Sequence, residues 1–191
     1  MEDLSLHILD IVENSINAGA KNVELAVRED FAQDLLRIEI IDDGKGMSAE
    51  VVQKVTDPFY TTRRTRKIGL GLSLLSEATR MANGRMHVHS VPGCGTKVTA
   101  TFQLSHIDRQ PLGNIADTIV AIVAGNPGVE ITYMCERNGC RFVFDTRKIK
   151  AELQGVQINS ACVLNSIKQH ILKNTQNFFT GTQKIEEKKY E

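Results

Sequence analysis

Apolar and polar positions recur with two different periods along this chain, and the changes of period predict where helices give way to strands. Over residues 3–18 apolar side chains return every third or fourth position, as at Leu4 and Ile8, which indicates an amphipathic helix. Residues 22–29 alternate instead, as a half-buried strand does. The predicted order is a helix at 3–18, strands at 22–29 and 35–41, a short helix from Ser48, a helix over 69–84, and strands at 85–91 and 96–104.

This order of elements predicts the fold class. Neighbouring strands joined by short turns favour a mixed or antiparallel sheet, and the helices between them are then placed on one face. We therefore expect an α+β chain in which residues 1–104 form a two-layer α/β sandwich.

The pattern changes after Leu104. Residues 105–113 resemble a linker, and a helix is predicted at 112–124. The Asn138-Gly139 dipeptide between two alternating runs predicts a β-hairpin. Two more helices are predicted near 146–154 and 161–178. We expect residues 105–191 to form a small C-terminal α+β module whose role the sequence does not assign, with a flexible tail at about 181–191.

Composition excludes several classes of function. Lys plus Arg equals Asp plus Glu at 23 each, so no field of the whole molecule favours nucleic acid or an anionic membrane. The acidic opening MEDLSLHILD matches no targeting peptide, and no apolar run of about 18 residues is present. We expect a cytoplasmic protein that binds neither nucleic acid nor membrane and recognises a protein partner locally.

Cysteines and histidines outside the main motifs offer weaker candidates. Four scattered cysteines form no secreted framework and no zinc pattern, so reduced thiols are expected. The pattern leaves open whether Cys94, Cys135 or Cys140 is redox-active, since the last two flank the predicted hairpin turn. His87 and His89 share one face of a predicted strand, and without a third ligand nearby we interpret them as polar surface residues.

Polar side chains line one face of the first helix. Asp10, Asn14 and Asn17 are spaced four and three residues apart, so they lie together. Mg²⁺ prefers oxygen ligands and is usually completed by water and substrate phosphates, so one amide oxygen from Asn14 suffices. Asp10, one turn earlier, is placed to act as a general base. The alternative is a solvated helix face.

Two glycine-rich segments follow, each directly at the end or the start of a predicted element. In IIDDGKGM, Asp42 ends a strand and Gly44 and Gly46 permit close backbone approach to a ligand. A carboxylate here can accept a hydrogen bond from the amino group of adenine, although an ordinary turn is the alternative. Gly69 and Gly71 begin a helix whose free N–H groups suit phosphate oxygens.

A basic cluster lies just before these glycines, at Arg63, Arg64, Arg66 and Lys67. It is either a set of cations that fold over a nucleotide or a solvated loop. The turn at Gly93, Gly95 and Thr96 is a further segment that can pack behind the adenine base or behind the start of the helix at Gly69 and Gly71.

Together these segments resemble the boxes of the GHKL superfamily, which is named for gyrase, heat-shock chaperones, histidine kinases and MutL. The matching segments are ENSINAG, IDDGKGM, DPFYTTR with IGLGLSLL, and GCGTKVTATF, in the family's order within residues 7–104. The resemblance implies the Bergerat-type ATP-binding fold, with ATP and Mg²⁺ as cofactors. It leaves residues 105–191 unmatched.

Pattern and resemblance together give one set of candidate site residues. Asn14 is implied as the Mg²⁺ ligand, Asp42 as the adenine contact, Phe59 as packing under a lid, and Thr96 as a hydrogen-bonding group near the adenine. Family ATPases carry Glu at the position of Asp10 and histidine kinases usually carry Asn, so this base is one methylene shorter than Glu. The candidate nucleotide-binding residues are Asn14, Asn17, Asp42, Gly44, Gly46, Met47, Phe59, Arg63, Arg64, Lys67, Gly69, Leu70, Gly71, Leu72 and Thr96.

The resemblance favours a bacterial regulatory protein that phosphorylates a Ser or His on a separate protein. Self-phosphorylation of the histidine kinase type is not expected, because the predicted ATPase domain begins at residue 3. An ATP-controlled binding switch or slow ATPase is the alternative. A MutL-like hydrolase that dimerises on ATP is a third hypothesis, and a homodimer is left open.

Overall fold

The computed structural model describes residues 3–56 and 71–179, and the predicted tail at 181–191 lies outside them. These residues form a mixed sheet of six strands with helices. The elements are α1 (Leu4–Asn17), β1 (Asn22–Asp30), β2 (Leu35–Asp42), α2 (Ala49–Thr56), α3 (Gly71–Met81), β3 (Arg85–Val91), β4 (Gly95–Gln103), α4 (Ile115–Gly125), β5 (Glu130–Arg137), β6 (Cys140–Asp145), α5 (Thr146–Glu152) and α6 (Ala161–Phe179).

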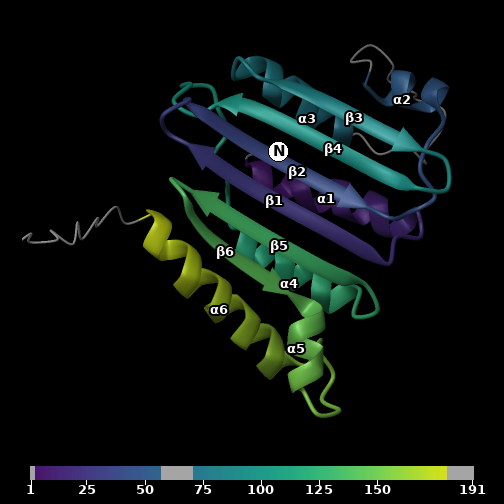
Figure 1. Ribbon diagram of the computed structural model, residues 1–191, viewed down its shortest axis with the longest axis vertical. Coiled ribbons are helices and arrows are strands. Elements are labelled where there is room, and N and C mark those ends of the chain that lie inside the picture. The colour runs from purple at the N-terminus through teal and green to yellow at the C-terminus, as the bar shows by residue number, and fades with distance from the viewer. Residues whose placement is uncertain (1–2, 57–70, 180–191) are drawn as a thin grey trace, which may run out of the picture.

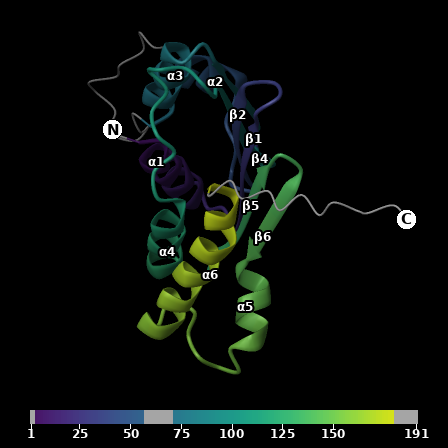
Figure 2. The same cartoon turned by 90° about the vertical axis from the view of Figure 1, so that its left-hand side faces the viewer.

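The strands lie in the order β3-β4-β2-β1-β5-β6 (Figure 1). All neighbouring pairs are antiparallel except β1 and β5, which run parallel. The helices α1, α3 and α4 lie behind the strands in Figure 1, and the edge-on view in Figure 2 shows the two layers. The predicted α+β class and two-layer α/β sandwich are confirmed.

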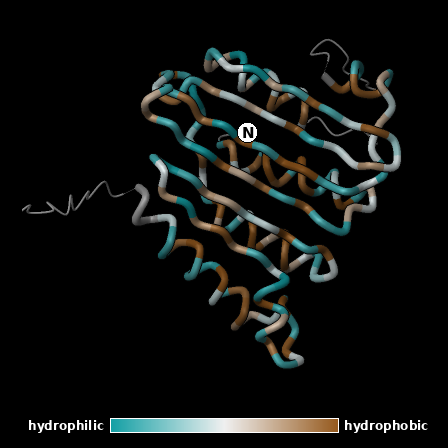
Figure 3. The backbone as a smooth tube through the Cα atoms, in the orientation of Figure 1, coloured by the Kyte–Doolittle hydropathy of each residue, from teal (hydrophilic) through white to brown (hydrophobic). Residues whose placement is uncertain are grey.

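The core lies between the helix layer and one face of the sheet. Alternate residues of each central strand point into it, and the apolar stripe of α1 closes it from the other side. Figure 3 shows the corresponding alternation of hydrophilic and hydrophobic residues along α6, whose apolar side packs on α4. Buried residues include Leu4, Ile8, Ile11, Val12, Val23, Leu25, Val27, Leu36, Ile38, Ile40, Leu75, Val98, Ala100, Phe102, Ile119, Tyr133 and Ile171.

Helix α1 begins where the sequence predicts it. The Asp3 carboxylate accepts a hydrogen bond from the Leu6 amide at 3.1 Å, which satisfies one of the free N–H groups of the first turn. His7, one turn of α1 before Asp10, is a buried polar side chain that is only 2% exposed. The segment before α4 covers it, and its Nε2 lies 3.0 Å from Oε1 of Gln110. Burial lowers the pKa of His7 and so favours the neutral imidazole.

Residues after 104 extend the same sheet. The whole of β5 pairs with β1, from Asn22 opposite Glu130 to Glu29 opposite Arg137. Helix α4 packs on α1, and the Leu4 amide donates to the Pro111 carbonyl at 2.9 Å. These residues do form helices and strands as expected. The division of the chain into domains at residue 104 stays a prediction.

The hairpin between β5 and β6 turns at the predicted dipeptide. Asn138 and Gly139 both have positive φ, 48° and 81°, as a two-residue turn of type I′ requires. Cys135 is opposite Phe142 and Cys140 is opposite Arg137. All four cysteines are free thiols, with Cys135 buried and Cys140 exposed. Burial raises the pKa of the Cys135 thiol, which disfavours the reactive thiolate.

None of the helices within residues 3–56 and 71–179 is both long and apolar enough to span a membrane.

Candidate functional site

The predicted adenine contact lies at the end of β2, where the chain leaves the sheet. Asp42 is 8% exposed, and both of its carboxylate oxygens are held. The Ser15 hydroxyl donates to Oδ2 at 2.7 Å, and the Gly44 amide donates to Oδ1 at 2.9 Å. Each oxygen keeps a further lone pair, so the fixed carboxylate can accept a hydrogen bond from an amino group.

The predicted Thr96 lies beside this carboxylate. It is the residue opposite Asp42 in the β2–β4 pairing, so the two side chains share one face of the sheet. The Thr96 hydroxyl is also 2.9 Å from the Ser90 hydroxyl. Two hydroxyls and a carboxylate therefore converge at one end of the site.

The loop after β2 rests directly on the β3–β4 turn. The Met47 amide donates to Oγ of Ser90 at 2.8 Å, and the Gly93 amide donates to the Lys45 carbonyl at 2.7 Å. A Cβ on Gly46, whose φ is 64°, would lie 2.0 Å from the Val91 carbonyl oxygen. Only glycine fits this approach, which is the physical basis of the glycine in the predicted motif.

Gly95 is equally constrained on the other side of the contact. Its φ is 101°, and a Cβ there would lie 1.9 Å from the carbonyl oxygen of Asp42. The two glycines thus bring two loops together at the end of β2 and β4, where the candidate site opens.

The predicted metal ligand and the predicted base both lie on α1. Asn14 lines the cavity described below, and Asp10 is one helical turn before it. Asp10 packs against the first residue of α3, since a Cβ on Gly71 would lie 2.9 Å from Cβ of Asp10. The beginning of an eleven-residue helix, which is its positive dipole end, therefore adjoins the predicted base.

A cavity of about 840 Å³ connects these groups. Its size is within the range of roughly 300–1,000 Å³ that is usual for small-molecule sites. Seven predicted residues line it, namely Asn14, Asn17, Asp42, Gly46, Met47, Leu72 and Thr96. The lining also contains Ile11, Ser15, Ala18, Lys45, Ser48, Val51, Val55 and Val98, which the sequence reasoning did not select. Its apolar walls suit a base, and its polar end on α1 suits phosphates.

Three predicted residues are close to the cavity without lining it. Gly44 holds the Asp42 carboxylate, and Asp10 and Gly71 contact each other beside Asn14. Six more predicted residues lie outside the described residues, namely Phe59, Arg63, Arg64, Lys67, Gly69 and Leu70.

Ser15 and Ser90 are the functional side chains that the sequence reasoning missed. Ser15 follows the predicted ligand Asn14 and is buried, which places it on the sheet side of α1 rather than on the polar stripe. Ser15 follows Ile8 by seven residues and Ile11 by four, so its spacing places it on the apolar face of the predicted helix and could have found it. Ser90 bonds across 43 residues to Met47, and no local pattern predicts that contact.

The donor set fits a Mg²⁺ ion that is held mainly by phosphate oxygens. Among the described residues there is no group of three or more His, Cys, Asp or Glu that could enclose an ion. Asn14 supplies one amide oxygen on the cavity wall, which is the share that Mg²⁺ needs when the nucleotide supplies the rest.

One protein family matches the chain across this region. Its description is histidine kinase-, DNA gyrase B-, and HSP90-like ATPase, and it matches residues 2–106.

Curated relatives match the same part of the chain. The non-motile and phage-resistance protein of Caulobacter vibrioides is 31% identical over 112 residues, which are 54% of this chain and 13% of that protein. The sensor protein kinase WalK of Staphylococcus haemolyticus is 34% identical over 106 residues, or 52% of this chain and 17% of that protein. The chain therefore spans less than a fifth of each relative's length.

Solved structures share the fold over a longer stretch. The Aquifex aeolicus MutL ATPase domain complexed with ADP has a TM-score of 0.50 and 18% identity, covering 81% of this chain and 70% of that one. The N-terminal domain of a DNA repair protein has a TM-score of 0.51 and 15% identity, covering 75% and 52%.

Proposed function

The chain belongs to the family of histidine kinase-, DNA gyrase B- and HSP90-like ATPases, and on that premise we propose that it binds MgATP and phosphorylates a Ser or His on a separate protein. The observation that supports this most is that one cavity is lined by both a candidate acceptor for adenine and a candidate ligand for the metal. These are the buried, fixed carboxylate of Asp42 and the amide side chain of Asn14.

In this proposal the amino group of adenine donates a hydrogen bond to the Asp42 carboxylate. The adenine ring lies between the loops held at Gly46 and Gly95. The phosphates then extend along α1 toward Asn14 and the start of α3. Mg²⁺, when bound with ATP, neutralises phosphate charge and orients the reacting γ-phosphate. The polar face of α1 then supplies both the metal ligand Asn14 and, one turn earlier, Asp10.

Asp10 is the proposed base of the transfer. The acceptor attacks the γ-phosphorus, the bond to the bridging oxygen breaks, and ADP leaves. For a serine acceptor, the Asp10 carboxylate takes the hydroxyl proton. General-base assistance of this kind contributes about 10²–10⁴ in rate. The name of the relative in Staphylococcus haemolyticus, a sensor protein kinase, supports phosphotransfer over hydrolysis.

An ATP-controlled binding switch or slow ATPase is the second candidate. It is favoured by the contact between Asp10 and Gly71, because the base touches the first residue of α3. A change at the γ-phosphate could therefore shift α3 and the surface around it without phosphotransfer.

The test follows the γ-phosphate of labelled MgATP in the purified protein and in a bacterial lysate to which the protein is added. Asp10→Asn is compared with Glu13→Gln, which removes an exposed carboxylate from the same helix but outside the cavity. A labelled protein band that needs the added chain, persists in Glu13→Gln and falls about 10²–10⁴-fold in Asp10→Asn would support the kinase.

Other outcomes separate the alternatives. Free phosphate that disappears in Asp10→Asn would indicate a hydrolase. If the protein binds ATP but neither transfers the label nor releases phosphate, the ATP-controlled binding switch would be the remaining candidate. A protein that binds no ATP with or without Mg²⁺ would contradict the proposal as a whole.

A further inference from the structure

The face of the sheet that the helices leave uncovered bears a line of arginines. Figure 1 looks onto this face. On β1 and β2 the core residues Val27, Leu36 and Ile38 point to the helices, so Arg28 and Arg37 point the other way. One line of paired positions crosses all six strands, namely Arg85 on β3, Thr101 on β4, Arg37 on β2, Arg28 on β1, Glu136 on β5 and Arg141 on β6. We call this line the arginine row.

Most of the positive charge in the arginine row is unmatched. Arg28 is 2.9 Å from the Glu39 carboxylate and 3.5 Å from that of Glu136. Arg37, Arg85 and Arg141 are exposed and make no ion pair with any residue in the parts of the chain that are described.

The acid nearest the centre of this face is already occupied. Glu39 is 8% exposed and is bonded to both Arg28 and Lys97, each at 2.9 Å. Burial opposes its ionisation, but Lys97 together with the charges of Arg37 and Arg28 outweighs burial, so the pKa of the Glu39 carboxyl is lowered. Glu39 is therefore an internal ion-pair partner of Arg28 and Lys97, and it attracts Arg37 only through space.

An arrangement of this kind is unfavourable in the isolated protein. Arg37 is directly opposite Arg28, and like charges at such positions repel by up to about 1 kcal/mol. Because the row is carried by strands rather than loops, the backbone positions of its arginines are fixed before any partner arrives.

The chemistry of this face selects among anionic partners. Within the described strands it bears no Phe, Tyr or Trp, so it lacks the usual platform on which nucleic-acid bases stack. Glu24, Glu39 and Glu136 on the same face would oppose a continuous phosphate backbone or an anionic membrane. A second copy of the chain would bring arginines against arginines. Discrete carboxylates, placed to meet the arginines and avoid the acids, are the better match.

The spacing of the arginines limits which arrangement of carboxylates on a partner can meet them. Neighbouring strands lie about 4.8 Å apart, so Arg85 and Arg37 are separated by roughly 10 Å, as are Arg28 and Arg141. Side chains seven residues apart on a helix are separated by about 10.5 Å along its axis. We propose that the arginine row binds an acidic helical segment of a partner protein.

This inference does not depend on the proposed function. The arginine row lies on the side of the sheet away from the helices, whereas Asp42 and Asn14 face the cavity between sheet and helices. Binding can therefore be measured without nucleotide, and a failure of either proposal leaves the other intact.

The test measures binding of a labelled peptide of about three heptads, with Glu repeated along one helical face, to the full chain by fluorescence anisotropy at low salt. A peptide with Gln in place of every Glu is the control ligand. The double variant Arg37→Glu with Arg85→Glu is compared with Lys148→Glu with Lys173→Glu, which changes the net charge equally at exposed positions of α5 and α6. If the charge-reversed double variant does not fold, the neutral double variant Arg37→Gln with Arg85→Gln replaces it in the test.

We expect the Glu peptide to bind, the arginine reversal to weaken it about tenfold or more, and the lysine control to stay within about twofold. Added salt should weaken binding to the native chain more than to the variant. Equal affinity for the Gln peptide, or an equal loss in the lysine control, would overturn the proposal. Tighter binding of an oligonucleotide or an anionic phospholipid vesicle through the same arginines would also overturn it, because the partner would belong to another class.

Discussion

Asp42 shows how much one side chain in this site depends on its neighbours. Its charge is stabilised by two donors, Ser15 and Gly44, which also fix its orientation before a ligand arrives. A hydrogen bond to a charged group contributes about 1.5–3 kcal/mol, or roughly a tenfold to hundredfold change in affinity. The sequence pattern predicted the carboxylate, whereas its orienting hydroxyl is visible only in the structure.

At the residue scale we expect Asp42→Asn to weaken ATP binding about a hundredfold or more, because an amide cannot accept on both of its atoms. Ser15→Ala should weaken it less, by about tenfold, since the carboxylate remains but loses one orienting donor. Titration calorimetry with ATP measures both. Asp43→Asn is the control, because Asp43 is exposed and bonds to Asn22 and Lys21 outside the cavity. Retained affinity in Asp42→Asn would refute the adenine assignment.

The β1–β2 turn is a second point where one residue connects elements. Asp34 has a φ of 51° and accepts hydrogen bonds from the Ser105 amide and hydroxyl, each at 2.7 Å, and from the Gln103 side chain at 2.9 Å. It therefore ties the turn to the end of β4 and to the segment that leads to α4. The Ser105 hydroxyl is the main cause that lowers the pKa of the Asp34 carboxyl, with Gln103 next.

At the element scale we expect Asp34→Asn to lower the free energy of unfolding at neutral pH, while Asn keeps the backbone conformation. The folded pKa lies below the ordinary 3.8, so the charged carboxylate stabilises the fold above that value. The stabilisation is lost as the pH falls through the folded pKa, and the two proteins should then converge. Urea unfolding at neutral and acid pH measures this. A gap that persists unchanged in strong acid would show that the charge is not its cause.

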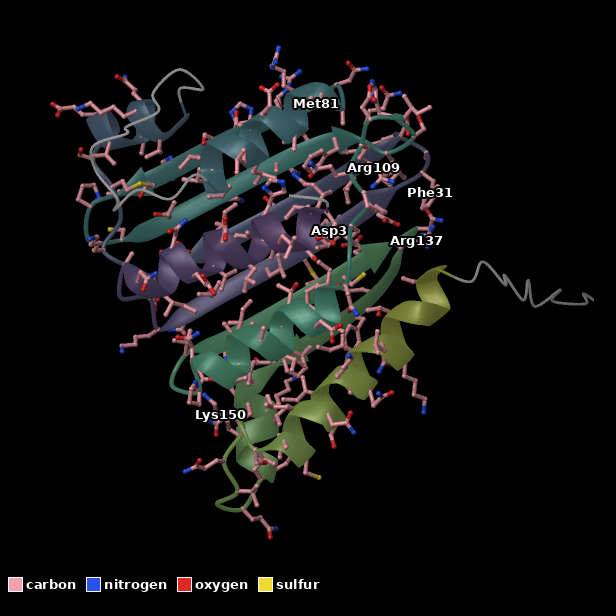
Figure 4. The ribbon with its side chains drawn as sticks, turned by 180° about the vertical axis from the view of Figure 1, so that it is seen from behind. Asp3, Phe31, Met81, Arg109, Arg137 and Lys150 are labelled. Atoms are coloured by element: carbon pink, nitrogen blue, oxygen red, sulfur yellow. The ribbon has the colours of Figure 1, made fainter. Side chains whose placement is uncertain are left out.

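The sheet as a whole depends on a pairing between distant parts of the chain. β1 lies between β2 and β5, and α4 packs on α1. The β1–β2 and β5–β6 turns also meet, where Arg137 stacks 4.6 Å over Phe31 and bonds Glu29 at 3.1 Å (Figure 4). Residues on both sides of position 104 therefore share one core.

At the scale of the whole molecule we expect a chain that ends after residue 106 to lose cooperative folding. Each apolar side chain that becomes exposed costs about 1.5–3 kcal/mol, and a domain's total stability is only about 5–15 kcal/mol. Exposing Leu4, Ile8 and Leu25 would thus cost about 5–9 kcal/mol, which is comparable to the whole stability of a domain. Thermal unfolding measures this, with a chain that ends after residue 179 as the control. A fragment that melts cooperatively near the full-length Tm would establish position 104 as a domain boundary.

The sequence alone determined the features whose cause is local. The period of apolar residues at Leu4 and Ile8 requires α1, and the turn at Asn138-Gly139 requires left-handed backbone. The glycine spacing after Asp42 likewise predicted a sharp turn, and in the structure Gly46 lies so close to the Val91 carbonyl that only glycine fits. Its approach to a ligand stays a prediction. Local sterics and periodicity act over a few residues, so they are readable along the chain.

Only the tertiary structure decided the contacts between distant segments. The parallel pairing of β5 with β1, the burial of His7 by the segment before α4, and the bond from Met47 to Ser90 all join residues with no pattern in common. The arginine row is of the same kind, because strand register rather than sequence spacing aligns Arg85, Arg37 and Arg28. Register is set by how the whole core packs, and no single segment contains that information.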